Sequence, residues 1–117
     1  MTIKALRLTP DGGLGRVELE PGPDGSHLNA MYGEIGCDLV DCVGLRGDLD
    51  LWLDDEGKLN QDWVVNPGAS ALLQSCGIPD LVAGTALLTG GADEEGNTLG
   101  ISDETAAQVE RLLRGGT

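Results

Sequence analysis

The sequence predicts an α+β fold in which one small domain, residues 1–117, holds a mainly antiparallel sheet and about three helices. The length of 117 residues allows one modest hydrophobic core. The 19 glycines, many of them beside Asp, Pro or Asn, divide the chain into short segments. The apolar patterns of these segments follow the order β-β-α-β-β-α-β-α, so we expect roughly four to six short strands.

A β-hairpin is expected at the start of the chain. Residues 2–9 alternate loosely, the breaker PDGG follows, and residues 14–20 resume the alternation. After a Pro- and Gly-rich loop, Ser26 is placed to cap a short helix that ends at Gly36. Apolar residues fall on one side of this helix: Leu28, Met31 and Ile35.

Segments 37–45 and 48–54 carry the clearest β-strand signal. In the second segment three leucines alternate with acids and Trp52, so Trp52 shares its face with the acids. Either strand could lie at an open edge of the sheet, which would allow a homodimer. Asp41 and Asp50 would then oppose nonspecific strand pairing.

The last part of the chain ends in a strongly marked helix. Asn66, followed by Pro67 and small apolar residues, predicts a helix capped by Asn66. The run LVAGTALLT from Leu81 suits a buried strand, and an acidic loop follows it. A C-terminal helix is expected over residues 102–114, because Ser102 can cap it, acids open its first turn and arginines close its last.

The chain is strongly acidic, with a formal net charge of −13 at pH 7. From Val17 to Gln108, 18 carboxylates face two basic side chains, Arg46 and Lys58. Such a field repels nucleic-acid phosphates and anionic membranes and attracts basic protein surfaces. We therefore expect a protein partner with a basic surface, no direct nucleic-acid binding and no membrane association.

Targeting features are also absent from the sequence. No apolar run approaches the ~20 residues of a membrane span, and the N-terminal run is too short for a secretory signal. Three cysteines, an odd number without a signal peptide, favour reduced thiols. A cytoplasmic location is expected.

Catalytic motifs are missing as well. The sequence has no acyl-transfer motif, no GxxxxGK[ST] and no GxGxxG after a strand. His27 is the single histidine and has no nucleophile in its sequence context. Cys37 and Cys42 would lie on opposite faces of one strand, where they cannot share a zinc ion. We expect no enzymatic activity, no cofactor and no metal.

The acidic strand pair is the candidate partner-binding site. Its residues are Asp48, Asp50, Trp52, Asp54, Asp55 and Glu56. Carboxylates of this set could bind a hard cation, but their spacing fails the calcium-loop pattern, so a solvated turn is favoured. Trp52 is either covered by a helix or exposed as an aromatic anchor with an acidic rim.

A second, alternative site would bind a small molecule. Its candidate residues are Tyr32, Arg46 and Asn66, although Asn66 equally suits a helix cap. A strongly acidic chain binds nucleotide signals poorly unless arginines or helix N-termini line the pocket.

Four successive segments resemble a known family: YGEIGCDLVDCVGL, LWLDDEGKLN, NPGASALL and LVAGTALLTGG. The family is domain of unknown function 3846, and the resemblance covers roughly residues 3–100. It implies an accessory protein of a phage, plasmid or other mobile element that acts inside a bacterial host. The family has no established catalytic residues, so the resemblance assigns none to this chain.

These observations favour a binding protein that inhibits a host defence or DNA-handling protein through its acidic surface. DNA mimicry is the sharpest form of this hypothesis, and it requires carboxylates spaced like phosphates on one face. The alternative is a module that sequesters or senses a nucleotide signal. An enzyme is the least favoured class.

Overall fold

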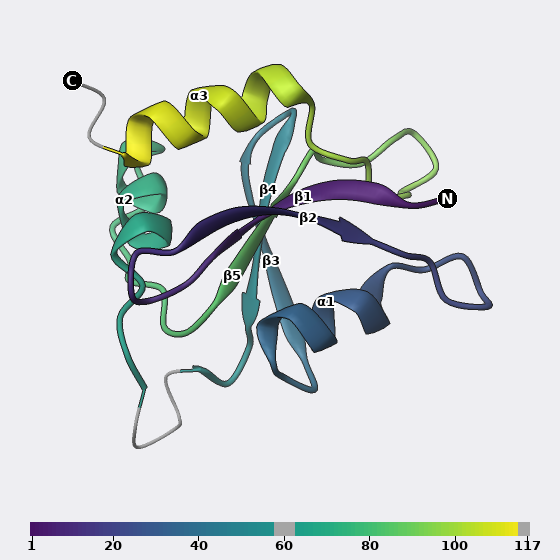
Figure 1. The fold of residues 1–117 in the computed structure, drawn as a ribbon, viewed down its shortest axis with the longest axis horizontal. Helices are drawn as coiled ribbons and strands as arrows, with labels where there is room; N and C mark the ends of the chain where they lie inside the picture. The colour runs from purple at the N-terminus through teal and green to yellow at the C-terminus, as the bar shows by residue number, and fades with distance from the viewer. Residues whose placement is uncertain (58–62, 115–117) are drawn as a thin grey trace.

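The computed structural model describes residues 1–57 and 63–114, and it confirms the α+β prediction (Figure 1). Its helices and strands follow the expected order. They are β1 (Ile3–Leu8), β2 (Leu14–Leu19), α1 (Leu28–Ile35), β3 (Val40–Arg46), β4 (Leu49–Asp54), α2 (Pro67–Ser75), β5 (Ala86–Thr89) and α3 (Asp103–Leu113).

The strands form one sheet in the order β2-β1-β5-β4-β3, and every neighbouring pair is antiparallel. The two hairpins, β1–β2 and β3–β4, therefore flank β5, which is the last strand in the sequence. Edge positions fall to β2 and β3. Because β4 is paired on both sides, the expectation that segment 48–54 could lie at an open edge is wrong, whereas β3 does lie at an edge.

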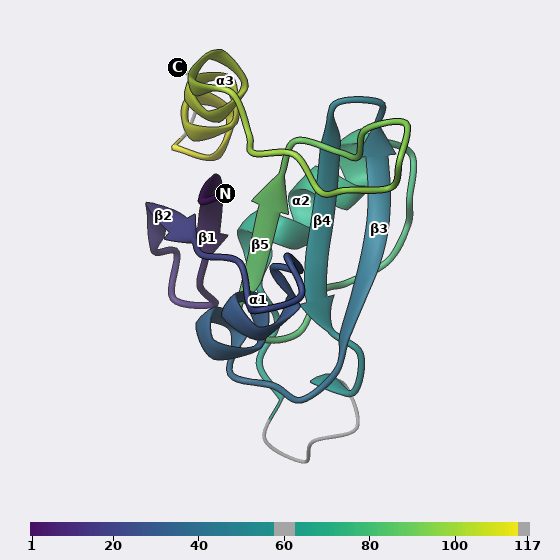
Figure 2. The same ribbon diagram turned by 90° about the vertical axis from the view of Figure 1, so that its right-hand side faces the viewer.

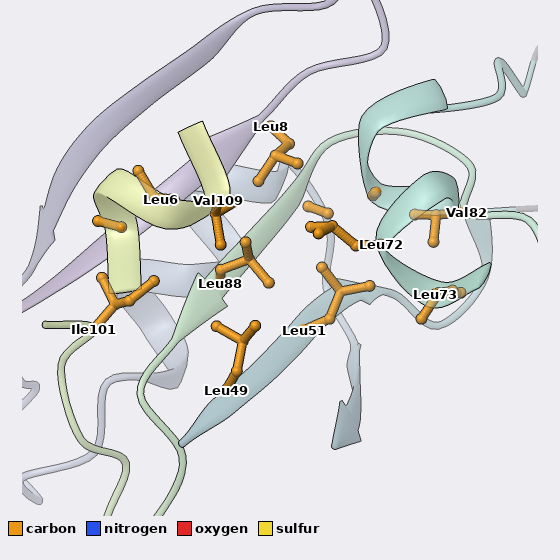
Figure 3. Packing of buried hydrophobic residues seen from close by; sticks show 13 residues of the cluster. Leu6, Leu8, Leu49, Leu51, Leu72, Leu73, Val82, Leu88, Ile101 and Val109 are labelled. Carbon is orange, nitrogen blue, oxygen red and sulfur yellow. The ribbon is translucent and has the colours of Figure 1, made fainter. Parts of the chain in front are cut away.

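Helices cover both faces of the sheet, and Figure 2 shows α1 and α2 on opposite sides of it. Alternation within β1 sends Leu6 and Leu8 to the face that α2 and α3 cover, while Ile3 and Ala5 face α1. The larger core lies on the α2–α3 side, where leucines of the sheet meet those of α2 and Val109 of α3 (Figure 3).

The caps of two helices agree with the sequence prediction. Asn66 Oδ1 accepts the N–H of Ala69 at 3.1 Å, and Ser102 Oγ accepts the N–H of Thr105 at 3.1 Å. At α1 the prediction is wrong by one position. His27 occupies the N-cap and makes no side-chain capping bond. Ser26 lies one residue before the N-cap, and its hydroxyl accepts the N–H of Leu28.

Two strands are shorter than expected. β3 begins at Val40 rather than at residue 37. In the run LVAGTALLT, β5 starts at Ala86, because Gly84 adopts a φ of 80° that interrupts an extended strand. The residue before that glycine, Ala83, is buried and forms an isolated bridge to Val65.

Candidate functional site

The acidic strand pair places its residues along the whole of β4. Asp50, Trp52 and Asp54 share the α1 face, and the leucines of β4 point to the opposite core. At about 3.3 Å per residue, Asp48 and Asp54 are roughly 20 Å apart. The six predicted residues therefore do not form one compact group.

Four carboxylates gather where β3 begins and β4 ends. Val40 lies opposite Asp54, and the N–H of Asp55 donates to the Leu39 carbonyl at 3.1 Å, which holds the two chain segments together. We call this group the acidic end. Its members are Asp38, Asp54, Asp55 and Glu56, and within residues 1–57 and 63–114 none of them is in an ion pair.

At the other end of the hairpin the charge is compensated. Arg46 Nε lies 2.6 Å from Asp48 Oδ1, so these two residues form an ion pair beside the β3–β4 turn. Asp50 is partly buried and lies opposite Gly44 of β3 and Thr89 of β5. The unpaired negative charge of this hairpin is thus concentrated at the acidic end, away from the β3–β4 turn.

Trp52 is partly buried rather than fully exposed. Its indole Nε1 donates to Thr89 Oγ1 at 2.8 Å, and its ring packs against the cluster of buried residues beneath α1. Of the two interpretations from the sequence, the structure therefore supports the one in which a helix covers this residue. Trp63, with 41% of its surface exposed, is the more accessible tryptophan.

The alternative ligand residues are not brought together. Tyr32 belongs to α1, whereas Asn66 caps α2 on the opposite side of the sheet. Asn66 is 0% exposed, and its Nδ2 donates to the carbonyls of Leu8 and Gly84 at 3.0 and 2.9 Å. With its Oδ1 already bonded to Ala69, the Asn66 side chain serves structure, not a ligand.

Most basic side chains of the described residues are held in ion pairs. Lys4 and Arg16 pair with Asp103, Arg16 also pairs with Glu110, and Arg7 pairs with Glu34. These contacts neutralise acids of α1 and α3, and the pair at the β3–β4 turn neutralises Asp48, so no basic side chain in the described part of the chain pairs with the acidic end. The negative charge of the acidic end therefore differs clearly from the partly neutralised surface of α1, of α3 and of the β3–β4 turn.

The thiols beside these acids are poor nucleophiles. Burial, with the charges of Asp50 and Asp41, raises the pKa of Cys42 to about 11. Burial and the nearby Asp54 and Asp38 likewise raise the pKa of Cys37. A thiolate is required for nucleophilic attack and for metal binding, so both thiols stay protonated and unreactive near neutral pH.

Neither a metal-binding cluster nor a membrane-spanning helix occurs in the part of the chain that the structure describes. Within it, no group of three or more His, Cys, Asp or Glu side chains is arranged to hold a metal ion. No helix among these residues is long and apolar enough to cross a bilayer.

A cleft that the sequence does not predict lies on the α1 side of the sheet. It has a volume of about 690 Å³ and is bounded by the segment before α1, the loop that follows β5, and the sheet. In Figure 2 that loop and α1 lie on the same side of the sheet, at opposite ends of β4. Residues from four separate parts of the sequence line the cleft, so no local pattern could reveal it.

The loop that forms one wall of this cleft is well held. Asp93 Oδ1 accepts the backbone N–H groups of Glu95 and Asn97, both at 2.9 Å. The hydrogen bond from the Asn97 N–H is the largest cause of the lowered pKa of Asp93. Asp93 therefore carries its negative charge at neutral pH while fixing the turn.

Comparison with known proteins gives a family but no activity. Residues 3–114 match the model of a family described as Domain of unknown function (DUF3846), so the match includes α3 and extends beyond the residues 3–100 expected from the resemblance. No curated protein matches this chain.

One solved structure with a similar fold is described as the crystal structure of small RNA methyltransferase HEN1. The TM-score is 0.63 at 12% sequence identity, over 93% of this chain and 16% of that chain. At that identity the likeness concerns the fold alone. The present chain spans about a sixth of the length of the methyltransferase structure.

Proposed function

We propose that this chain, which belongs to the family described as Domain of unknown function (DUF3846), acts by binding a protein with a basic surface through its acidic end. In the setting that the family resemblance suggests, it is an accessory protein of a phage or other mobile element. There it inhibits a host defence or DNA-handling protein in the bacterial cytoplasm.

The acidic end, which forms no ion pair within residues 1–57 and 63–114, is the observation that carries this proposal. Asp38, Asp55 and Glu56 are exposed, and Asp54 is partly buried beside them. Several carboxylates at one site raise the association rate of a basic partner and reject acidic surfaces. The overall charge of −13 acts in the same direction at longer range.

Binding to a basic protein groove is favoured over a strict DNA mimic. A strand that mimics a row of DNA phosphates would need a carboxylate at every second position on one face. On the α1 face of β4 that row contains Asp50 and Asp54, but Trp52 stands between them. The acidic end therefore suits a localised basic site better than a long DNA-binding channel.

The proposal is tested by affinity capture from a bacterial lysate with three forms of the protein. One is the wild type. The second neutralises the acidic end with Asp38→Asn, Asp54→Asn, Asp55→Asn and Glu56→Gln. The third is a control that removes four exposed charges elsewhere, with Glu18→Gln, Glu20→Gln, Glu94→Gln and Glu95→Gln. Both variants change the net charge from −13 to −9, so they separate a local site from net charge.

The specific partner should be captured by the wild type and the control and lost from the acidic-end variant. Raising the salt from about 0.1 to 0.5 M should also release it, because the Debye length falls from about 10 Å to well below that distance. A purified partner should then lose DNA binding when the wild type is added. Equal capture by all three forms, or capture unaffected by salt, would contradict the proposal.

A further inference from the structure

The cleft beside α1 combines an apolar interior with acidic walls. Trp52 and Ile3 contribute from the sheet, and Met31 contributes from α1. The volume of about 690 Å³ falls within the range of roughly 300–1,000 Å³ that small-molecule sites occupy. Its walls come from two separate loop segments, so the cleft is a product of the fold.

Large apolar side chains remain uncovered at the mouth of this cleft. Leu28 is 38% exposed, Leu99 is 43% exposed, and Met1 is 93% exposed, and all of them line the cleft. Exposing such side chains to water is unfavourable, by about 25 cal/mol for each Å². A ligand with an apolar body would remove part of that surface from water.

The charged side chains at the cleft are carboxylates. Asp24 stands in the segment before α1 and Asp93 in the opposite loop. Each uses Oδ1 to accept backbone N–H groups, from Ser26 in the case of Asp24. Asp24 Oδ2 has no hydrogen-bond partner within the described part of the chain, and Asp93 Oδ2 has a single bond, from Asn97 at 3.2 Å.

Positive charge is scarce among the lining residues. They include no lysine and no arginine. The basic groups among them are the amino group of Met1 and the imidazole of His27, whose Nε2 lies 2.6 Å from the Met1 carbonyl oxygen. A carboxylate or phosphate ligand would meet two negative side chains here, whereas a cation would be attracted by both.

We propose that this cleft binds a small organic cation, with an apolar body against Trp52 and Leu99 and an ammonium or guanidinium group between Asp24 and Asp93. This inference goes beyond the proposed function, since it uses a different set of residues and a different class of ligand. It also departs from the nucleotide signals considered at the sequence level, because the charges that line this cleft disfavour phosphates.

The test uses probes that share one apolar body and differ in charge. They are 4-phenylbutylamine, the neutral 4-phenylbutanol and the anionic 4-phenylbutyrate. Trp63→Phe leaves Trp52 as the sole tryptophan, so emission reports on the cleft directly. Each probe is titrated to about 10 mM, where even a millimolar Kd gives nearly full occupancy. The amine should bind tightest, the alcohol more weakly and the carboxylate weakest.

A pair of matched variants in that background separates the cleft from the overall charge. Asp24→Asn with Asp93→Asn keeps both Oδ1 acceptors and removes both charges, whereas Glu18→Gln with Glu20→Gln removes two exposed charges outside the cleft and outside the acidic end. The first pair should weaken amine binding by about two- to fivefold per carboxylate, the usual range for exposed ion pairs, and leave alcohol binding unchanged. The second pair should preserve amine binding to within about twofold.

Equal affinities for the three probes would overturn the proposal, as would an unchanged Trp52 emission with all of them. An equal loss of amine binding in both variant pairs would also overturn it, because the attraction would then be a property of net charge. Thermal unfolding of each variant, followed by circular dichroism, establishes that it is folded. None of these results depends on capture of a protein partner through the acidic end.

Discussion

Replacing Asn66 by alanine should destabilise the protein by about 3–5 kcal/mol. The substitution removes the cap of α2, which is worth about 1 kcal/mol. It also leaves the carbonyls of Leu8 and Gly84 without the N–H groups that reach them at 3.0 and 2.9 Å. The contact with Leu8 is buried and the one with Gly84 is part-buried, and each carbonyl that loses its donor costs about 1–2 kcal/mol. The free energy of unfolding is measured by urea titration with far-UV circular dichroism.

Two matched variants make this prediction specific. Ser102→Ala removes the cap of α3, whose N-cap residue is exposed, and should cost about 1 kcal/mol. Asn66→Asp keeps the cap acceptor but places a carboxylate against two carbonyls at a site that is 0% exposed. Burial would raise the pKa of this new carboxyl, so its cost should grow as the pH rises above about 4. If Asn66→Ala costs no more than Ser102→Ala, the buried bonds of Asn66 contribute nothing and the reasoning fails.

Three other predictions concern charge. Added salt, to about 0.5 M, should raise the thermal midpoint because it screens the self-repulsion of a chain with net charge −13, and an unchanged midpoint would argue against that repulsion. The pKa of Cys42, raised from 9.0 to about 11 in the folded state, should give stability that is complete below pH 9 and declines as the pH rises through about 11. Cys42→Ser should remove that decline in alkaline urea titrations. Arg16→Ala should raise the pKa of Glu110 toward its ordinary value, because the hydrogen bond from Arg16 is the largest cause of its lowered pKa, and NMR titration of the carboxyl carbon measures this.

The sequence predicts each helix and strand of the described residues because the local signals are strong. Alternation in β4 and the cap residues Asn66 and Ser102 depend on neighbours within a few positions, which a sequence displays directly. The extent of β5 was overestimated because Gly84 reads as one more small apolar residue until its φ of 80° is known. The order of strands in the sheet is a tertiary property, and the sequence left it open.

The candidate sites were harder to predict for the same reason. The acidic residues of β4 were found, but their division by the Arg46–Asp48 ion pair and the cover over Trp52 depend on tertiary contacts. The cleft is lined by Asp24 and Asp93, two residues that are far apart in the sequence. The alternation of residues along one strand carries no information about which distant segments pack around the same cleft.

The central place of β5 has a consequence for how the chain folds. β1 and β4 each pair with β5 and not with one another, and the contact between Leu6 and Leu88 closes a very long loop. Long-range pairing of this kind slows folding. During synthesis both hairpins leave the ribosome before β5 exists, with the edges of β1 and β4 unpaired. A chain that ends before Ala86 would keep those edges open, and we expect it to aggregate rather than persist as a smaller domain.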